Sequence, residues 1–132
     1  TDEERELIYR AFVYTGKILV DNGINVIFDA TANKREFRNL ARKLIDKYME
    51  VYLDCPLEIC IKREMNRKNT LGAPKGIYLK AMKGESKTVP GVQSPYEIPE
   101  NPEVKLETHK LTPKECAEKI FKKALELFKI SL

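Results

Sequence analysis

The sequence has few of the residues that build metal sites or disulfide frameworks. Its 132 residues include one histidine, three cysteines and no tryptophan. Because no Cys-x-x-Cys spacing occurs, this set argues against a zinc site. The sparse, odd-numbered cysteines (Cys55, Cys60 and Cys116) indicate reduced thiols rather than a disulfide framework. We therefore predict a cytoplasmic location.

Long apolar runs are also absent. No run reaches the roughly 18 residues that a membrane helix needs, and residues 1–5 lack the pattern of a signal peptide. Twenty-four basic and 20 acidic residues leave a net charge of +4, which suits an anionic ligand without demanding nucleic acid. We predict neither a membrane nor a nucleic acid as the partner.

Helical and strand patterns alternate along the chain. Apolar residues at helical spacing, with capping boxes at Thr1/Glu4 and Thr112/Glu115, indicate helices. A β-branched and aromatic run at 24–28 and two further short segments are typical of strands. Between residues 84 and 102, four prolines indicate an irregular segment. The predicted helices cover residues 1–21, an apolar stripe from Phe37 to Tyr48, and residues 57–67, 77–83 and 113–128; the predicted strands are 24–28, 50–54 and 104–107.

This order predicts an α/β fold with a parallel sheet. Three strands make a thin sheet, and the chain opens on a helix, whereas a doubly wound domain normally opens on a strand. We therefore expect residues 1–132 to be a single domain that corresponds to the C-terminal part of a larger α/β domain. The last helix is predicted to bury Ala117, Ile120, Phe121, Ala124 and Phe128.

Residues with phosphate and metal chemistry follow the predicted strands. In open α/β sheets ligands bind beyond the carboxyl ends of the strands, and Asp29 stands at the first of these ends. Its carboxylate suits Mg²⁺ or acceptance of a proton from a hydroxyl nucleophile; the alternative is a plain turn or helix cap.

Two groups of basic residues suit phosphate groups, although a solvated helix face is the alternative for both. Arg35, Arg38 and Arg42 form one group, and Arg63 and Arg67 lead into a glycine-bearing loop at 66–74. A phosphate cradle of the form Gly-x-x-x-x-Gly-Lys-Ser/Thr does not occur. The pair Gly16-Lys17 lies within a predicted helix and is followed by Ile18 rather than a hydroxyl residue.

Three stretches resemble the adenylylsulfate kinase (APS kinase) family. Residues 75–87 read K-G-I-Y-L-K-A-M-K-G-E-S-K, residues 90–103 read P-G-V-Q-S-P-Y-E-I-P-E-N-P-E and residues 50–60 read E-V-Y-L-D-C-P-L-E-I-C. The family pattern is K-G-L-Y-K-K-A-R-x-G-E-I-K, then S-P-Y-E-x-P-E-N-P-E, and E-V-Y-V-D-T-P-L-E-V-C. The resemblance covers nearly the whole chain and corresponds to the C-terminal two-thirds of the family domain, without its phosphate-binding loop.

The resemblance implies a three-layer P-loop kinase fold whose N-terminal strand and phosphate loop lie outside these residues. It also implies transfer of the γ-phosphate of ATP, with Mg²⁺, to the 3′-hydroxyl of adenosine 5′-phosphosulfate (APS) in sulfate assimilation. Arg5, Arg35 and Lys87 would bind the acceptor, while Arg63 and Arg67 would belong to an ATP lid over about residues 63–76. A homodimer is compatible with the resemblance. We expect the 132 residues alone to lack kinase activity.

Departures from the family pattern leave the acceptor open. Ile8 replaces an asparagine, Gln93 an aspartate, and Val89 an aromatic residue whose stacking on a base is worth about 1–3 kcal/mol. Residues 29–35 (D-A-T-A-N-K-R) look more like polynucleotide-kinase-like and seryl-tRNA-kinase-like enzymes. The alternatives are therefore a P-loop kinase acting on another hydroxyl (a nucleic-acid 5′-end, an aminoacyl-tRNA or a small molecule), or a non-catalytic nucleotide-binding remnant.

Overall fold

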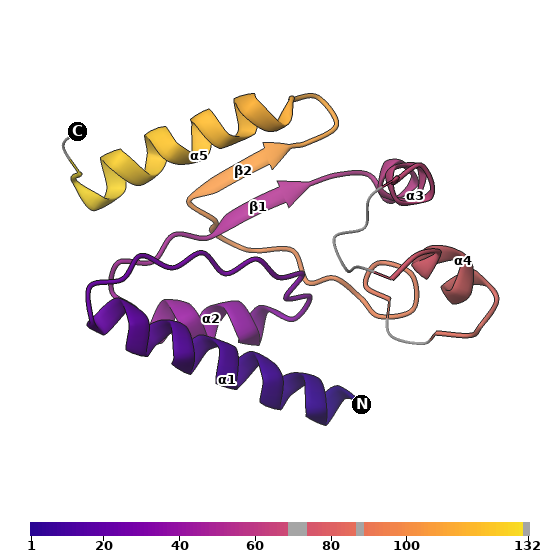
Figure 1. The fold of residues 1–132 in the computed structure, drawn as a ribbon, viewed down its shortest axis with the longest axis horizontal. Helices are drawn as coiled ribbons and strands as arrows, with labels where there is room; N and C mark the ends of the chain where they lie inside the picture. The colour runs from indigo at the N-terminus through magenta and orange to yellow at the C-terminus, as the bar shows by residue number, and fades with distance from the viewer. Residues whose placement is uncertain (69–73, 87–88, 131–132) are drawn as a thin grey trace. The chain divides into compact units, whose positions relative to one another are not determined.

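The computed structural model describes residues 1–68, 74–86 and 89–130. The chain divides into two compact units, Thr1–Glu50 with Glu97–Pro102, and Val51–Tyr96 with Glu103–Leu132. Whether residues 1–132 act as a single domain stays a prediction. The elements, labelled in Figure 1, are α1 (Asp2–Asp21), α2 (Arg35–Leu44), β1 (Val51–Asp54), α3 (Leu57–Met65), α4 (Ile77–Met82), β2 (Val104–Glu107) and α5 (Pro113–Phe128).

Helix α1 begins and ends where its local sequence predicts. The Thr1 hydroxyl accepts a hydrogen bond from the backbone N–H of Glu4 at 3.2 Å, and the Glu4 carboxylate completes the capping box. The helix ends before Gly23, whose φ of +79° is accessible to glycine at little cost. The predicted first helix is thus confirmed.

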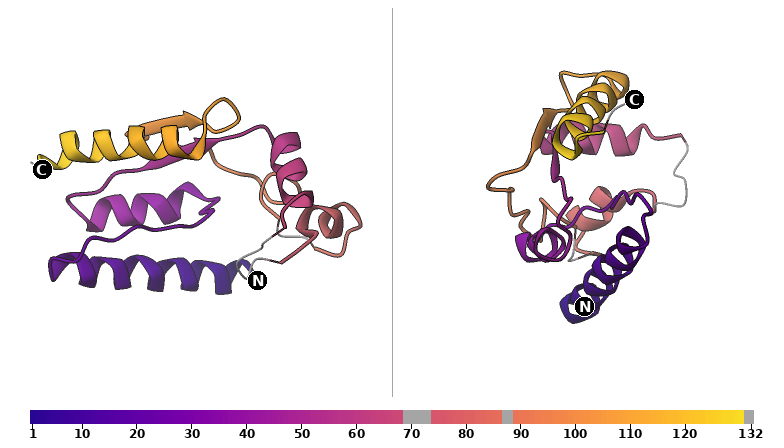
Figure 2. Two further views of the ribbon diagram at one scale, coloured as in Figure 1. Left: turned by 45° about the horizontal axis from the view of Figure 1, so that its top comes forward. Right: turned by 90° about the vertical axis from the view of Figure 1, so that its left-hand side faces the viewer.

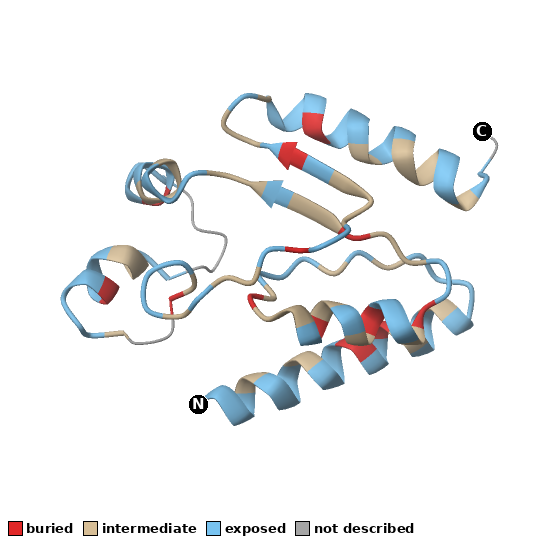
Figure 3. Cartoon of the chain, turned by 180° about the vertical axis from the view of Figure 1, so that it is seen from behind, coloured by how far each residue is buried: buried red, intermediate tan, exposed pale blue. Residues whose placement is uncertain are grey.

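Helices α1 and α2 pack side by side, as both Figure 1 and Figure 2 show. The rings of Tyr9 and Phe37 stack with centroids 4.3 Å apart. Val13, Phe37, Ala41 and Ile45 are buried, and in Figure 3 the red positions within α1 and α2 lie where the two helices face each other. The apolar stripe of α2 therefore forms the core of the first unit.

The predicted strand at 24–28 is wrong. This segment runs extended beside α1 and α2 without pairing to either strand of the described chain. Its apolar residues divide between two surroundings: Ile27 is 92% exposed, whereas the ring of Phe28 packs edge-on against Phe12 at 5.0 Å. A strand needs a hydrogen-bonding neighbour, which the β-branched composition of the segment does not supply.

The second unit is built on a parallel pair of strands. β1 pairs with β2 in the register Val51–Val104 to Asp54–Glu107. Both predicted strands are confirmed, with β1 one residue shorter than expected, and so is the α/β class with a parallel sheet. Because the strands are parallel, their carboxyl ends lie at one edge.

Helix α5 follows β2 and packs on it. Its capping box is formed as predicted, since the Thr112 hydroxyl accepts from the N–H of Glu115 at 3.2 Å. Cys116 is buried, but Ala117 is exposed and Phe121 is 54% exposed, so the prediction that these two are core is wrong. The two-stranded sheet offers too narrow a surface to cover that side of the helix.

The segment between β1 and β2 contains α3, α4 and an irregular stretch. The buried Glu64 of α3 accepts the N–H of Gly76, the residue before α4, at 2.7 Å. The side-chain amide of Gln93 donates to the carbonyl of Ala81 in α4. The predicted irregular segment is confirmed where the structure describes it. None of the helices in the described part of the chain combines the length and apolar character that crossing a bilayer requires.

Candidate functional site

In the first unit, the loop that carries Asp29 is held at its far end. The N–H of Ala32 donates to the Tyr9 hydroxyl at 2.8 Å, and the Ala32 carbonyl accepts from the Arg38 guanidinium. Ala32 has a φ of +39°, which residues with a Cβ rarely adopt. One residue on, the carbonyl of the buried Asn33 accepts from the N–H of Glu97 at 2.8 Å. The loop is therefore fixed by groups from two helices and a distant segment.

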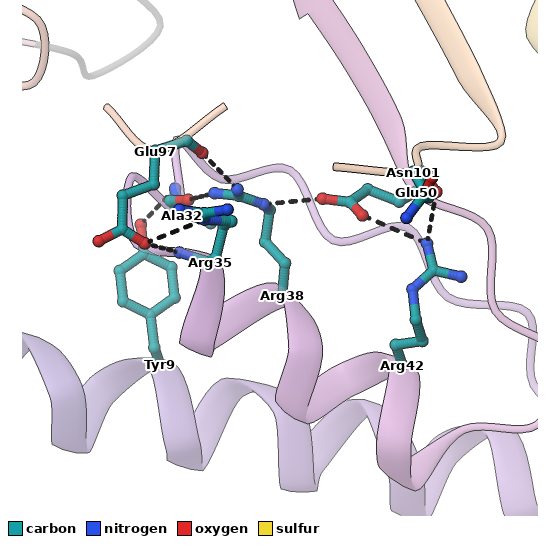
Figure 4. A network of polar contacts seen from close by, with 8 residues as sticks. All are labelled: Tyr9, Ala32, Arg35, Arg38, Arg42, Glu50, Glu97 and Asn101. Carbon is teal, nitrogen blue, oxygen red and sulfur yellow. Dashed lines mark hydrogen bonds and ion pairs between the residues drawn. The ribbon is translucent and has the colours of Figure 1, made fainter. Parts of the chain in front are cut away.

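The three arginines of α2 contact carboxylates and carbonyls (Figure 4). The Arg35 guanidinium pairs with Glu100 and lies 3.8 Å from Glu97, whose carboxylate also accepts the Arg35 N–H at 2.6 Å. Arg42 reaches Glu50 at 3.2 Å. We refer to Arg35, Arg38, Arg42, Glu50, Glu97 and Glu100 as the arginine–glutamate network.

Arg38 and Glu50 form the buried centre of this network. Their side chains are 10% and 9% exposed, and Nε of Arg38 lies 2.7 Å from the Glu50 carboxylate. The same guanidinium donates to the carbonyls of Ala32 and Glu97, so three acceptors surround it. A buried ion pair needs such extra hydrogen bonds to offset the desolvation of both charges. The geometry supports a structural role for Arg38 in place of the phosphate contact that its charge suggested.

Two further predicted site residues, Asp29 and Arg5, also lie in this unit. Asp29 is exposed in the loop, and Arg5, in the first turn of α1, is half-buried. No cluster of three metal-binding side chains occurs in the described residues. Mg²⁺ bound with a nucleotide commonly takes one or two carboxylates together with phosphate oxygens and water. The single Asp29 carboxylate is compatible with that kind of site.

In the second unit, Arg63 lies at the carboxyl edge of the sheet. Its guanidinium donates to the Thr108 carbonyl at 2.7 Å and to the Thr108 hydroxyl at 3.2 Å. Thr108 follows β2, and its N–H donates to the carbonyl of Asp54, the last residue of β1, at 2.8 Å. The predicted lid arginine thus sits where parallel sheets bind ligands. The same rule could have selected Thr108, which directly follows a predicted strand.

The end of β1 carries a charged cluster. Nζ of Lys105 lies 3.1 Å from the Asp54 carboxylate and 5.5 Å from the centre of the Tyr52 ring. The Tyr52 hydroxyl donates to the same carboxylate at 3.2 Å. The contact with Lys105, and then that with Tyr52, lowers the pKa of Asp54 below its ordinary 3.8. The carboxylate therefore stays charged at neutral pH.

The remaining predicted residues fall in and around the lid, about 63–76. Arg67 is exposed just beyond α3. Lys87 and residues 69–73 lie outside the described residues. The structure adds Glu64, whose second oxygen is buried without a partner in the described chain. Sequence offered no signal for Glu64, because its burial depends on how α3 packs.

Comparison with known proteins places these features in a family. The family model described as adenylylsulphate kinase matches residues 1–107. A probable adenylyl-sulfate kinase of Pyrococcus abyssi is 42% identical over 125 residues, which cover 95% of this chain and 67% of the relative. The chain belongs to the adenylylsulphate kinase family.

Other adenylylsulphate kinases agree with this assignment. That of Clostridium acetobutylicum is 43% identical over 119 residues, covering 89% of this chain and 55% of its own length. The solved structure of the Mycobacterium tuberculosis APS kinase in complex with AMPPNP and APS superposes with a TM-score of 0.76 at 29% identity, covering 98% of this chain and 69% of that one. The resemblance seen in the sequence is thus confirmed, and the fold is that of the P-loop kinases. The chain spans about 55–67% of the length of these two curated relatives.

Proposed function

We propose that this chain is the acceptor and lid part of an ATP-dependent kinase that phosphorylates the 3′-hydroxyl of APS. The observation that carries the proposal is the superposition of 98% of the chain on a kinase solved with AMPPNP and APS. By the same family argument, the protein acts in sulfate assimilation in the cytoplasm, with a homodimer as the oligomeric state to test.

On the acceptor side, Arg5, Arg35 and Lys87 bind the anionic groups of the nucleotide. The arginine–glutamate network supports this role for Arg35, because Glu97 and Glu100 hold its guanidinium in one orientation. A preorganised guanidinium loses less side-chain entropy when it binds a phosphate or a sulfate. Asp29, exposed in a loop held at Ala32, receives the proton of the attacking hydroxyl.

On the ATP side, Arg63 and Arg67 form part of the lid. The contacts of Arg63 with Thr108 support its place at the ligand edge of the sheet. Phosphoryl transfer requires mainly positioning and neutralisation of charge, which arginine side chains can provide without covalent chemistry. Mg²⁺, when bound with ATP, would neutralise phosphate charge, and Asp29 is the residue suited to contact it.

One observation favours a second candidate, a P-loop kinase with a different hydroxyl acceptor. Val89, at the position of the family's stacking aromatic, is 9% exposed and therefore presents little surface to a base. Gln93, at the position of the family's aspartate, uses its side chain to hold the Ala81 carbonyl. Both side chains therefore contribute to packing and hydrogen bonding within this chain. They offer the adenine base of APS fewer contacts than the family's aromatic residue and aspartate would.

A chimera tests the proposal. Residues 1–132 replace the matching part of the P. abyssi relative, so that they are assayed within a complete domain. We expect ATP consumption that depends on APS and yields a 3′-phosphorylated product. Consumption of ATP with a nucleic-acid 5′-end or another hydroxyl compound, but not with APS, would favour the second candidate. A folded chimera that consumes no ATP with any acceptor would contradict both. The unaltered relative is the matched control.

A further inference from the structure

Cys55 and Cys60 lie on either side of the N-terminus of α3, one just before the helix and one in its first turn. Pro56 is the N-cap of this nine-residue helix, so Cys55 stands one residue before the cap and Cys60 is the fourth helical residue. Side chains at these two positions commonly pack on each other in the hydrophobic staple, which sets the direction of the chain entering a helix. In this protein both members of the pair carry a thiol.

The contacts of the two residues agree with this pairing. The Cys60 Sγ donates to the Cys55 carbonyl at 3.8 Å. Both thiols are free, and both residues are half-buried, whereas Cys116 is buried in α5. Burial and a hydrogen bond with the Cys55 thiol raise the pKa of Cys60 above its ordinary 9.0. Cys60 is therefore a protonated thiol whose sulfur lies against the backbone carbonyl of Cys55.

A cation lies against the other sulfur. Nη1 of Arg63 is 3.7 Å from the Cys55 Sγ. A guanidinium and the N-terminus of a helix are the surroundings in which protein cysteines react as nucleophiles. The two thiols thus differ in their surroundings. Cys55 lies beside the positive charge of Arg63, whereas burial keeps the Cys60 thiol protonated.

We propose that Cys55 and Cys60 form an oxidation site that hydroperoxides convert into a reversible disulfide. The Cys55 sulfur attacks one peroxide oxygen, the O–O bond breaks, and an alcohol or water leaves with a proton, so that Cys55 becomes a sulfenic acid. The Cys60 sulfur then attacks Cys55, and the hydroxyl leaves as water with the Cys60 proton. The two sulfurs lose two electrons and the peroxide gains them; a reducing thiol reverses the reaction. This site does not depend on the proposed kinase activity.

Mass spectrometry of the intact chain tests the site. The reduced, folded protein is treated with hydrogen peroxide, the peroxide is removed, and the protein is then unfolded, alkylated and digested with trypsin. Digestion leaves Cys55 and Cys60 in the peptide 48–62 and Cys116 in the peptide 115–119. We expect the first peptide to lose the mass of two hydrogen atoms and to resist alkylation. The peptide with Cys116 should be fully alkylated, because burial in the folded protein protects its thiol from the peroxide. When the peroxide is added in urea, where the fold is lost, the preference for Cys55 and Cys60 over Cys116 should disappear.

Variants separate the roles of the two thiols. Cys60→Ser should leave a sulfenic acid on Cys55 that dimedone traps, and Cys55→Ser should abolish both products. Arg63→Gln should slow the oxidation of Cys55 several-fold, because the cation is removed. Cys116→Ser is the matched control and should form the disulfide at the wild-type rate. Oxidation of Cys116 as fast as Cys55 in the folded protein, a link between chains only, or the absence of a link would overturn the proposal.

Discussion

At the residue scale, the surroundings of a charge decide its role. Arg35, Arg38 and Arg42 have the same side chain and lie on one helix, yet only Arg38 is almost fully buried among three acceptors. The side chains of Arg35 and Arg42 are 42% and 38% exposed. Exposed ion pairs contribute little free energy, whereas breaking a buried pair leaves an uncompensated charge.

Replacing Arg38 should therefore destabilise the chain more than replacing its neighbour. Arg38→Met leaves the Glu50 carboxylate buried with less compensation, and we expect a loss of about 3 kcal/mol in the free energy of unfolding. Arg42→Met, the matched control, should cost less than about 1 kcal/mol. Urea unfolding followed by circular dichroism measures both. Equal losses would show that burial of the pair is not what makes Arg38 important.

Asp29 carries the proposed chemistry of the acceptor side. In the chimera, Asp29→Asn keeps the shape of the side chain but removes its charge and basicity, so kcat should fall roughly a hundredfold with a small change in KM for APS. Asp46→Asn, another exposed aspartate just beyond α2, is the control and should leave both constants unchanged. An unchanged kcat for Asp29→Asn would contradict the proposed role as a base and would favour the alternative, that Asp29 only caps a turn or a helix.

At the element scale, close packing explains a glycine that resembles part of a phosphate motif. Gly16 is buried in the middle of α1, and a Cβ built there would overlap the ring of Phe28. The glycine lets the 24–28 segment approach the helix. Its function is therefore packing in the first unit, which the pair Gly16-Lys17 did not indicate by itself.

Gly16→Ala should destabilise the chain although alanine favours helices. The gain in helix propensity is about 1 kcal/mol, whereas overpacking against Phe28 costs about 1–3 kcal/mol. We expect a net loss, measured by thermal unfolding. The double variant Gly16→Ala with Phe28→Leu should recover part of it, since the smaller side chain makes room. A single variant more stable than wild type would contradict the tight approach.

The cap of α5 should make stability depend on pH. Hydrogen bonds from the Thr112 N–H and hydroxyl lower the pKa of Glu115 below its ordinary 4.5. A lowered pKa stabilises the fold fully above the unfolded value, and this contribution disappears as pH falls through the folded value. Between about pH 6 and about pH 3, the Tm of wild type should fall more than that of Glu115→Gln.

Two controls accompany this pH experiment. Glu118→Gln removes a carboxylate of the same helix that has no cap contact, and its Tm should follow that of wild type across the range. Thr112→Ala removes the cap itself and should cost about 1 kcal/mol at neutral pH. If the Tm of Glu115→Gln and that of wild type fall equally as the pH is lowered, protonation of Glu115 does not contribute to the pH dependence of stability.

At the scale of the whole molecule, the prediction concerns ATP turnover by the 132 residues on their own. The 132 residues contain no Gly-x-x-x-x-Gly-Lys-Ser/Thr cradle, whose backbone N–H groups and lysine hold the phosphates of ATP. We therefore expect the 132-residue chain to consume no ATP in the presence of APS, while the chimera does. A coupled assay of ATP hydrolysis measures both. Turnover by the chain alone would show that another phosphate site exists.

The sequence alone determined the features that depend on neighbouring residues. The capping boxes at Thr1 and Thr112 were predicted correctly, because each requires only hydrogen bonds between residues three positions apart. The strand 104–107 was also predicted at its observed place, although its pairing with β1 is a tertiary contact. The family was also predictable, since its motifs are contiguous. Of the candidate site, Arg63 was predicted as a lid residue from its charge and from the family resemblance, and its contact with Thr108 beyond the end of β2 came from the structure.

Only the tertiary structure decided which residues come into contact when they are far apart in the sequence. It gave Arg38 its partner Glu50 and a carbonyl 59 residues away, buried Glu64 beside Gly76, and left 24–28 without a neighbouring strand. It also placed Arg63 against the sulfur of Cys55. Such contacts depend on the packing of whole elements, and a charge or an apolar run can satisfy several packings equally well. Local patterns therefore predict where elements begin and end, whereas the partners of their side chains follow from the fold.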